Sequence, residues 1–200
     1  HRTPCPAVIN KKIIGGFFSP DLNEISKLKP DMIFMTRIHK KIENELKKTD
    51  AQIVQMDDVS VAGFYENMIK LGQIFKKEKE AQQVIQKVKK ELDHIAKKTS
   101  IIPENKRLRA ARILGRDKIM LPAGNTFHNE YVSLAGGIPL KTGSDKGFVE
   151  VTLEQWKNLN PQFLFYCESD QPVIDKYFKE PGWKDVDAVK NGKVVMFPCD

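Results

Sequence analysis

The chain has 200 residues, enough for one large domain or for two lobes of about 100 residues each. Hydrophobic residues make up 40% and charged residues 30%, as in folded proteins, and no apolar run approaches the roughly 20 residues that span a bilayer. The net charge is +7. Lysines alternate with glutamates and no aromatic residues interleave with them, so this charge does not predict a nucleic-acid partner.

Short apolar runs alternate with amphipathic segments from one end of the chain to the other. This alternation predicts α/β units with parallel sheets. Strands are expected at residues 12–15, 32–35, 52–55, 110–114, 163–166 and 194–197. Helices are expected at residues 21–28, 38–48, 60–75, 126–135, 152–159, 171–178 and 185–190.

One further helical segment, residues 76–99, is longer than the others and contains neither proline nor glycine. Its apolar residues recur at spacings of three and four, the signature of one apolar helix face. At 1.5 Å per residue such a helix reaches roughly 35 Å, more than a connection inside one small domain needs. We therefore expect residues 76–99 to connect an N-terminal lobe, residues 1–75, to a C-terminal lobe, residues 100–200.

An internal repeat with an offset of 131 residues supports two related lobes. Each copy consists of a capped short helix, a Leu-x-Pro stop and an apolar strand. The first copy runs from Asp21 to Met35 and the second from Thr152 to Tyr166. Asp21 and Thr152 are good helix N-caps, and the proline ends each helix. A single helix–proline–strand turn has the same appearance without any duplication, but the constant offset favours a duplicated lobe.

Several segments resemble, in their order and spacing, the helical-backbone class of periplasmic binding proteins. That class includes the cobalamin-, haem- and siderophore-binding components of ABC importers. The resemblance extends over nearly the whole chain, and its most specific piece lies close to the C-terminal end. The segments are LNEISKLKPDMIFM, the long helix at residues 76–99, EYVSLAGGIPL, VEVTLEQWKNLNPQFLFY and PGWKDVDAVKNGKVVMFP.

The resemblance implies an α/β fold of two Rossmann-like lobes joined by one long α-helix. It implies that a monomer captures a metal chelate (an iron–siderophore complex, haem or cobalamin) between the lobes. The chelate then passes to the permease and ATPase of an importer, on the periplasmic or outer, membrane-anchored side of the membrane. Family members begin with a strand and a helix upstream of His1 and end with one or two helices beyond Asp200, so the N-terminal lobe is expected to be truncated.

The resemblance also implies docking onto the permease through one surface glutamate on each lobe. Glu154 matches the position in the second lobe directly. In the first lobe the matching position is Asn23, and Glu24 lies one residue later. A shift of one residue turns a helical side chain by about 100°, so Glu24 is expected to point in a different direction from the glutamate of family members. A first-turn glutamate is also favoured by the helix dipole alone.

In open α/β sheets ligands bind beyond the carboxyl ends of the strands, and in two facing lobes those ends form the cleft. Phe17 and Phe148 match places where family members set aromatic residues against a flat ligand. Arg37 and Lys146 are expected to pair with carboxylates or phosphate on the ligand. The candidate ligand-binding residues are Phe17, Phe18, Arg37, Phe127, His128, Lys146, Phe148, Cys167 and Glu168.

Some of these residues have alternative interpretations. Phe17 and Phe18 are equally consistent with core packing. His128, at the helix start NTFHNE, is a candidate ligand of haem iron or cobalt and also a candidate surface or capping histidine. Four scattered histidines do not form a metal site by their spacing, so no protein-bound metal and no cofactor are expected.

Other functions remain as alternatives. The chain lacks the motifs of nucleotide-binding enzymes, serine hydrolases and zinc proteases, so no catalytic activity is expected. A zinc or manganese carrier of the same fold and a cytosolic α/β enzyme or sensor domain are the competing readings. Of the three cysteines, Cys5, Cys167 and Cys199, the last two each follow an apolar run. If those runs are parallel neighbours, their sulfurs lie at one sheet edge, where a disulfide can form.

Overall fold

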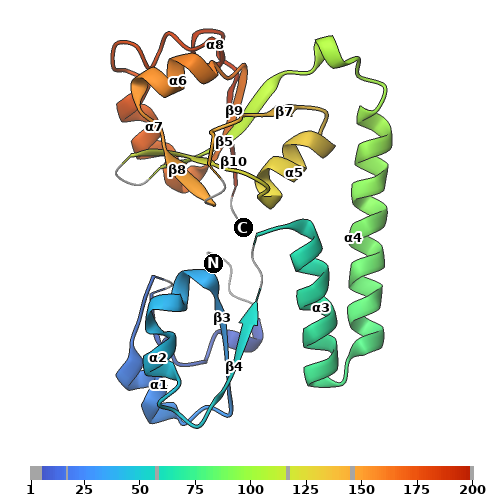
Figure 1. Ribbon diagram of the computed structural model, residues 1–200, viewed down its shortest axis with the longest axis vertical. Coiled ribbons are helices and arrows are strands. Elements are labelled where there is room, and N and C mark those ends of the chain that lie inside the picture. Colours follow the sequence, from blue (N-terminus) through green and yellow to red (C-terminus); the bar gives the residue numbers. More distant parts are fainter. Residues whose placement is uncertain (1–5, 17, 57–58, 116–117, 145–146, 199–200) are drawn as a thin grey trace.

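The computed structural model describes residues 6–16, 18–56, 59–115, 118–144 and 147–198. Two lobes are joined by an antiparallel pair of helices, α3 (Val61–Phe75) and α4 (Glu78–Thr99). Figure 1 shows this hairpin along one side of the molecule, with α4 reaching from the level of the N-terminal lobe to the C-terminal lobe. The expected two-lobed α/β fold with one long connecting helix is confirmed.

The N-terminal lobe contains two small sheets. Strands β3 and β4 pair in parallel, with Met32 opposite Gln52, while β1 and β2 form a separate antiparallel hairpin. Its buried core is small and consists of Ile25, Met35 and Leu46. The elements are η1 (Pro6–Val8), β1 (Gly15–Gly16), β2 (Ser19–Pro20), α1 (Leu22–Leu28), β3 (Met32–Thr36), the 3-10 helix η2 (Arg37–Ile42), α2 (Glu43–Leu46) and β4 (Gln52–Met56).

The C-terminal lobe is built on one mixed six-stranded sheet. The strand order is β10-β9-β5-β6-β8, and β7 pairs with β5 outside that path. β10, β9 and β5 are parallel, whereas β6 is antiparallel to β5 and to β8. The elements are η3 (Glu104–Lys106), β5 (Arg109–Gly115), β6 (Ile119–Pro122), α5 (Phe127–Leu134), β7 (Ile138–Pro139), β8 (Phe148–Glu150), α6 (Leu153–Leu159), β9 (Phe163–Cys167), η4 (Glu168–Asp170), α7 (Gln171–Tyr177), α8 (Asp187–Lys190) and β10 (Val194–Phe197).

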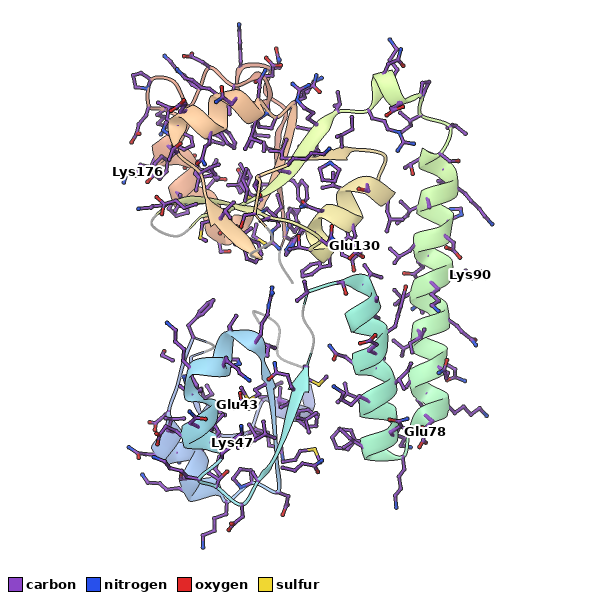
Figure 2. The ribbon with its side chains drawn as sticks, viewed as in Figure 1. Glu43, Lys47, Glu78, Lys90, Glu130 and Lys176 are labelled. Atoms are coloured by element: carbon purple, nitrogen blue, oxygen red, sulfur yellow. The ribbon has the colours of Figure 1, made fainter. Side chains whose placement is uncertain are left out.

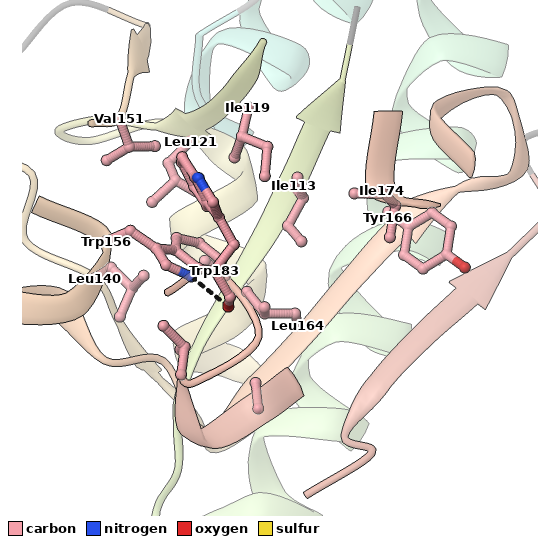
Figure 3. Close-up of a cluster of buried hydrophobic side chains, with 13 residues drawn as sticks. Ile113, Ile119, Leu121, Leu140, Val151, Trp156, Leu164, Tyr166, Ile174 and Trp183 are labelled. Carbon is pink, nitrogen blue, oxygen red and sulfur yellow. Dashed lines mark hydrogen bonds between the residues drawn. The ribbon is translucent and has the colours of Figure 1, made fainter. Parts of the chain in front are cut away.

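The main hydrophobic core covers one face of the six-stranded sheet of the C-terminal lobe. Trp156 of α6 is fully buried, and its indole N–H donates to the carbonyl oxygen of Trp183 over 3.3 Å. Figure 3 shows the two indoles beside Ile113, Leu121 and Leu164. Because the polar atom of the buried indole is satisfied, the whole side chain contributes apolar burial without a desolvation penalty. This core makes the C-terminal lobe the better packed of the two.

The internal repeat has the same geometry in both lobes. Asp21 accepts backbone N–H groups at the start of α1, and Thr152 does so at the start of α6. Lys29 and Asn160 end these helices in the left-handed conformation, with φ of 45° and 36°. Ile25 is buried on α1 where Trp156 is buried on α6, at the same offset of 131. The structure therefore confirms the sequence repeat as two equivalent helix–proline–strand units.

The left-handed cap of α1 supplies a stability test. Lys29→Gly is expected to raise the free energy of unfolding by about 1 kcal/mol, because that conformation costs a residue with a β-carbon roughly this much. Asn160→Gly is expected to give no such gain, since Asn160 accepts the Asp187 N–H and donates to the Asp187 carboxylate. Denaturant unfolding of both variants measures the difference, and a loss of stability in Lys29→Gly would refute the interpretation.

The connecting helix begins later than its apolar pattern predicts. Lys76 ends α3 in the left-handed conformation, and Lys77 donates its N–H to Gly72 over 2.7 Å. Gly72 allows this tight turn, because a β-carbon there would lie 2.8 Å from the β-carbon of Ala81. The expected helix at 76–99 is therefore the 22-residue Glu78–Thr99, about 33 Å long. Within the described residues, no helix combines the length and apolar character needed to cross a bilayer.

Two other expected elements differ from the structure. Residues 12–14 form no strand; only Gly15 and Gly16 do, in a hairpin that requires a φ of 99° at Gly15. The helix expected at 38–48 is the 3-10 helix η2 followed by one α-helical turn. The His39 ring accepts the N–H of Thr36 at the start of η2, a local bond that periodicity does not reveal. The short strands β6, β7 and β8 were not predicted. The antiparallel pairing of β6 with β5 and β8 makes the six-stranded sheet mixed rather than parallel.

Candidate functional site

The parallel strands of each lobe end where the lobes meet. In Figure 1 the arrow of β4 points toward the C-terminal lobe. Parallel α/β sheets bind ligands at these ends. The side chains at the ends of β5, β9 and β10 are therefore the first place to seek a binding site.

One polar side chain, Arg112 of β5, organises this end of the C-terminal lobe. Its Nη1 lies 2.7 Å from Nε2 of His128, and its Nη2 donates to Sγ of Cys167 over 2.9 Å. His128 comes from the first turn of α5 and Cys167 is the last residue of β9. We call Arg112, His128 and Cys167 the Arg112 cluster. Sheet register and helix α5 thus bring together three residues that are far apart in the sequence.

Arg112 carries a charge that the described part of the protein does not neutralise. Its side chain is partly buried, and burial lowers the pKa of its guanidinium while the nearby Asp170 raises it. The group stays protonated at neutral pH. Among the described residues no carboxylate lies within ion-pair distance of Arg112, and its buried Nε has no hydrogen-bond partner. A partly desolvated cation without an ion-pair partner among the described residues is costly, which points to a functional role.

His128 is buried and neutral. Only 7% of the residue is exposed, so the interpretation as a surface histidine is wrong. Arginine only donates hydrogen bonds, so His128 Nε2 accepts from Arg112 and the ring proton lies on Nδ1. Burial and the neighbouring Arg112 charge lower the pKa of His128 to about 4. Its Nδ1, like the Arg112 Nε, is buried without a partner among the described residues.

The low pKa of His128 makes stability depend on pH. The unfolded pKa is about 6.5 and the folded pKa about 4, so in this interval the unfolded chain binds a proton that the folded protein excludes. The free energy of unfolding should not respond to this group above about pH 6.5, and should fall by roughly 3 kcal/mol at most as the pH drops to about 4. Denaturant unfolding of the wild type and His128→Gln over this range measures the effect. Equal pH slopes would contradict a buried neutral histidine.

Aromatic rings surround the Arg112 cluster. Phe127 stacks on His128 with ring centroids 3.8 Å apart, and Phe148 meets the same ring edge-on at 5.3 Å. Phe197, at the end of β10, lies with its ring centroid 5.8 Å from the Arg112 guanidinium carbon. Phe148 is 37% exposed, so its ring remains available to a ligand. The structure therefore combines a cation with an apolar surface, an arrangement suited to an anionic ligand with a bulky body.

The N-terminal lobe reaches this site through Arg37. Arg37 opens η2 directly after β3, and a β-carbon built on Gly147 would lie 2.6 Å from its Nη2. Gly147 directly precedes Phe148, whose ring contacts His128. A continuous series of contacts thus leads from Arg37 in one lobe to the Arg112 cluster in the other. We call this region the lobe junction.

The predicted site residues meet only in part. The structure brings Phe127, His128, Phe148 and Cys167 together around Arg112, with Arg37 nearby. Phe18 is 60% exposed in the β1–β2 turn, so it is not a core residue. Glu168 begins η4 after Cys167, while Phe17 and Lys146 lie outside the described residues.

Cys167 is disulfide-bonded. β9 and β10 are parallel neighbours with Cys167 opposite Phe197, as the disulfide hypothesis requires. Cys5 and Cys199, the other cysteines, lie outside the described residues, so pairing with Cys199 stays a prediction. No group of three or more histidine, cysteine or acidic residues in the described ranges is placed to hold a metal ion.

A separate hollow lies within the N-terminal lobe. It has a volume of about 320 Å³ and is lined mainly by apolar residues, among them Ile25, Phe34 and Met35. It opens onto that lobe's small core and contains neither Arg37 nor any residue of the Arg112 cluster. Because it has no charged group to orient a ligand, the lobe junction is the stronger candidate site.

Comparisons with known proteins agree with the fold. The chain is 26% identical over 184 residues to the Fe(3+)-citrate-binding protein YfmC of Bacillus subtilis, covering 90% of this chain and 58% of that protein. It is 27% identical to the iron-uptake system-binding protein of the same organism, covering 93% of this chain and 61% of the relative. The chain thus spans about three-fifths of the length of both relatives.

A solved structure shares the fold of this chain, and a family model identifies its family. Staphylococcus aureus IsdE complexed with heme superposes with a TM-score of 0.86 at 20% identity, covering 98% of this chain and 78% of that one. This likeness shows the shared fold. The model of the periplasmic binding protein family matches residues 4–200. The resemblance noted in the sequence is confirmed: the chain belongs to the periplasmic binding protein family.

Proposed function

We propose that this protein is the extracytoplasmic substrate-binding component of an ABC importer and captures an anionic iron chelate at the lobe junction. The observation that carries the proposal is Arg112, a partly desolvated guanidinium without a carboxylate partner among the described residues. An anionic ligand would supply the missing counter-charge through charge-assisted hydrogen bonds. Phe127 and Phe148 would cover the body of the ligand. The names of the relatives, which refer to Fe(3+)-citrate, iron uptake and heme, support iron as the cargo.

The state of His128 supports recognition of ligand oxygen atoms over direct ligation of iron. Metal coordination through Nε2 requires its lone pair, which accepts from Arg112 at 2.7 Å. Ligation of haem iron would therefore first require that contact to break. The buried Nδ1–H is instead a hydrogen-bond donor without a partner among the described residues. Together with Arg112 it suits a carboxylate oxygen.

The two glutamates expected to dock onto the permease differ in their surroundings. Glu154 is exposed in the first turn of α6 and forms no ion pair with a described residue. Glu24 forms ion pairs with Lys12 and Lys27, which lower the pKa of its carboxyl. Glu154 is therefore proposed as the main docking residue. Transport that survives Glu154→Lys unchanged would remove this role.

The ligand is tested with a defined panel. Purified protein is titrated with ferric citrate, haem, iron-free citrate and a neutral ferric trihydroxamate, and tryptophan fluorescence reports binding. We expect ferric citrate to bind with a Kd of about micromolar or tighter and the neutral complex to bind much more weakly. If no member of the panel binds, the proposal fails. If haem alone binds, and His128→Gln abolishes its absorbance shift, iron ligation replaces anion recognition.

A further inference from the structure

Helices α3 and α5 cap each other across the boundary between the connecting hairpin and the C-terminal lobe. Glu130 of α5 accepts the first N–H of α3, that of Val61, at 3.1 Å. In return, Phe127 at the start of α5 donates its N–H to the carbonyl oxygen of Val59 over 2.7 Å. The first N–H groups of a helix have no partner within it, and a carboxylate at this end is stabilised by the helix dipole. Figure 2 shows Glu130 where α5 meets α3.

The opposite end of α5 is tied to the same hairpin. The hydroxyl of Thr99, the last residue of α4, donates to the carbonyl oxygen of Leu134 over 2.6 Å. Gly136 lets the chain pass close by, because a β-carbon there would lie 3.1 Å from the β-carbon of Thr99. α5 is thus hydrogen-bonded at one end to α3 and at the other to α4. Two attachments at separate points resist rotation of the hairpin relative to the C-terminal lobe.

Among the described residues, the contacts between the hairpin and the N-terminal lobe are exposed. Phe34 of β3 and Phe75 of α3 have ring centroids 5.9 Å apart, yet 40% of Phe34 and 58% of Phe75 are exposed. Lys70 of α3 donates to the carbonyl oxygen of Gln55 over 2.8 Å from an exposed position. Exposed contacts of this kind contribute less than the part-buried hydrogen bonds that hold α5 to the hairpin. The two sides of the hairpin are therefore held with unequal strength.

We propose that Glu130 locks the α3–α4 hairpin onto the C-terminal lobe, so that closure moves the N-terminal lobe against one rigid body. Glu130 is a positioning residue in this account, since it acts through α3 and does not contact ligand. The proposal is stated for the protein without ligand, so it does not depend on the identity of the chelate. It differs from the boundary expected from the sequence, which assigned residues 1–75 to the N-terminal lobe, because here α3 moves with the C-terminal lobe.

Distance measurements in the ligand-free protein test the proposal. Spin labels are attached through genetically encoded ketone residues, which leaves the cysteines intact, at exposed Ser26 of α1, Gln73 of α3 and Asn158 of α6. We expect a narrow distance distribution between positions 73 and 158 and a broader one between 26 and 73. Glu130→Ala should broaden the 73–158 distribution, and Glu130→Gln, which retains an acceptor oxygen, should broaden it less.

Hydrogen exchange gives a second readout of the same lock. Loss of a hydrogen bond to a charged group should raise exchange in the first turn of α3 roughly 10- to 100-fold in Glu130→Ala. Glu66→Gln is the matched control, because it removes an exposed charge from α3 and should change neither readout. A wild-type 73–158 distribution as broad as that between 26 and 73 would overturn the proposal. So would unchanged distances and exchange in Glu130→Ala.

Discussion

Arg112→Met is expected to weaken binding of ferric citrate roughly 10- to 100-fold, as expected when hydrogen bonds to a charged group are lost. The same substitution should change the free energy of unfolding little, because removal of a partly desolvated charge offsets the loss of the hydrogen bonds to His128 and Cys167. Isothermal titration calorimetry and denaturant unfolding measure the two effects. Lower affinity without lower stability is the signature of a cation retained for its ligand.

Arg109→Met is the matched control for this prediction. Arg109 lies on the same strand, and its guanidinium donates to the carbonyl oxygen of Asn160 over 2.8 and 3.1 Å. Its loss should lower stability and leave ferric citrate affinity unchanged. If Arg112→Met behaved like Arg109→Met, Arg112 would be a structural residue and the anion-binding site would lie elsewhere.

Trp156→Ala is expected to lower the free energy of unfolding by about 3–5 kcal/mol, because it leaves a large cavity in the main core. It also leaves the Trp183 carbonyl oxygen without the indole donor. Thermal unfolding should show a drop in Tm of roughly 6–20 °C for a protein of this size. Trp156→Phe keeps most of the apolar volume, so its loss should be clearly smaller.

The repeat provides the comparison for this substitution. Ile25 is the residue equivalent to Trp156 in the first lobe, and it is 5% exposed in a core of three buried residues. Ile25→Ala should cost about 2–5 kcal/mol, toward the lower end because a small core collapses more easily around a cavity. A larger loss for Ile25→Ala than for Trp156→Ala would contradict the description of the C-terminal core as the dominant one.

The sequence predicts those parts of the fold that depend on local signals. Asp21 and Thr152 cap α1 and α6 as their side-chain chemistry predicts, and a proline follows each repeat helix. The short strands β6, β7 and β8 have no long apolar run, so only their pairing in the sheet defines them. Tertiary packing also explains why α4 begins at Glu78 and not at residue 76, because Gly72 of α3 and Ala81 of α4 approach each other closely at the turn between the two helices.

The candidate site was predictable where it follows from strand order. Cys167 lies at the carboxyl end of β9, beside the parallel strand β5, as the strand order predicts. His128 and Phe148 join it from the first turn of α5 and the start of β8. Arg112 was missed, although one charged residue inside the apolar run AARIL was a visible signal. Its importance depends on α5 covering it and on Asp170 failing to pair with it, and neither fact can be read from the order of residues.

Iron-edge anomalous diffraction from crystals grown with ferric citrate tests the central claim most directly. The account predicts an iron peak at the lobe junction, with a citrate oxygen within hydrogen-bonding distance of the Arg112 guanidinium and no bond from His128 to the metal. An iron peak in the hollow of the N-terminal lobe, or one coordinated by His128 with Arg112 displaced, would contradict it.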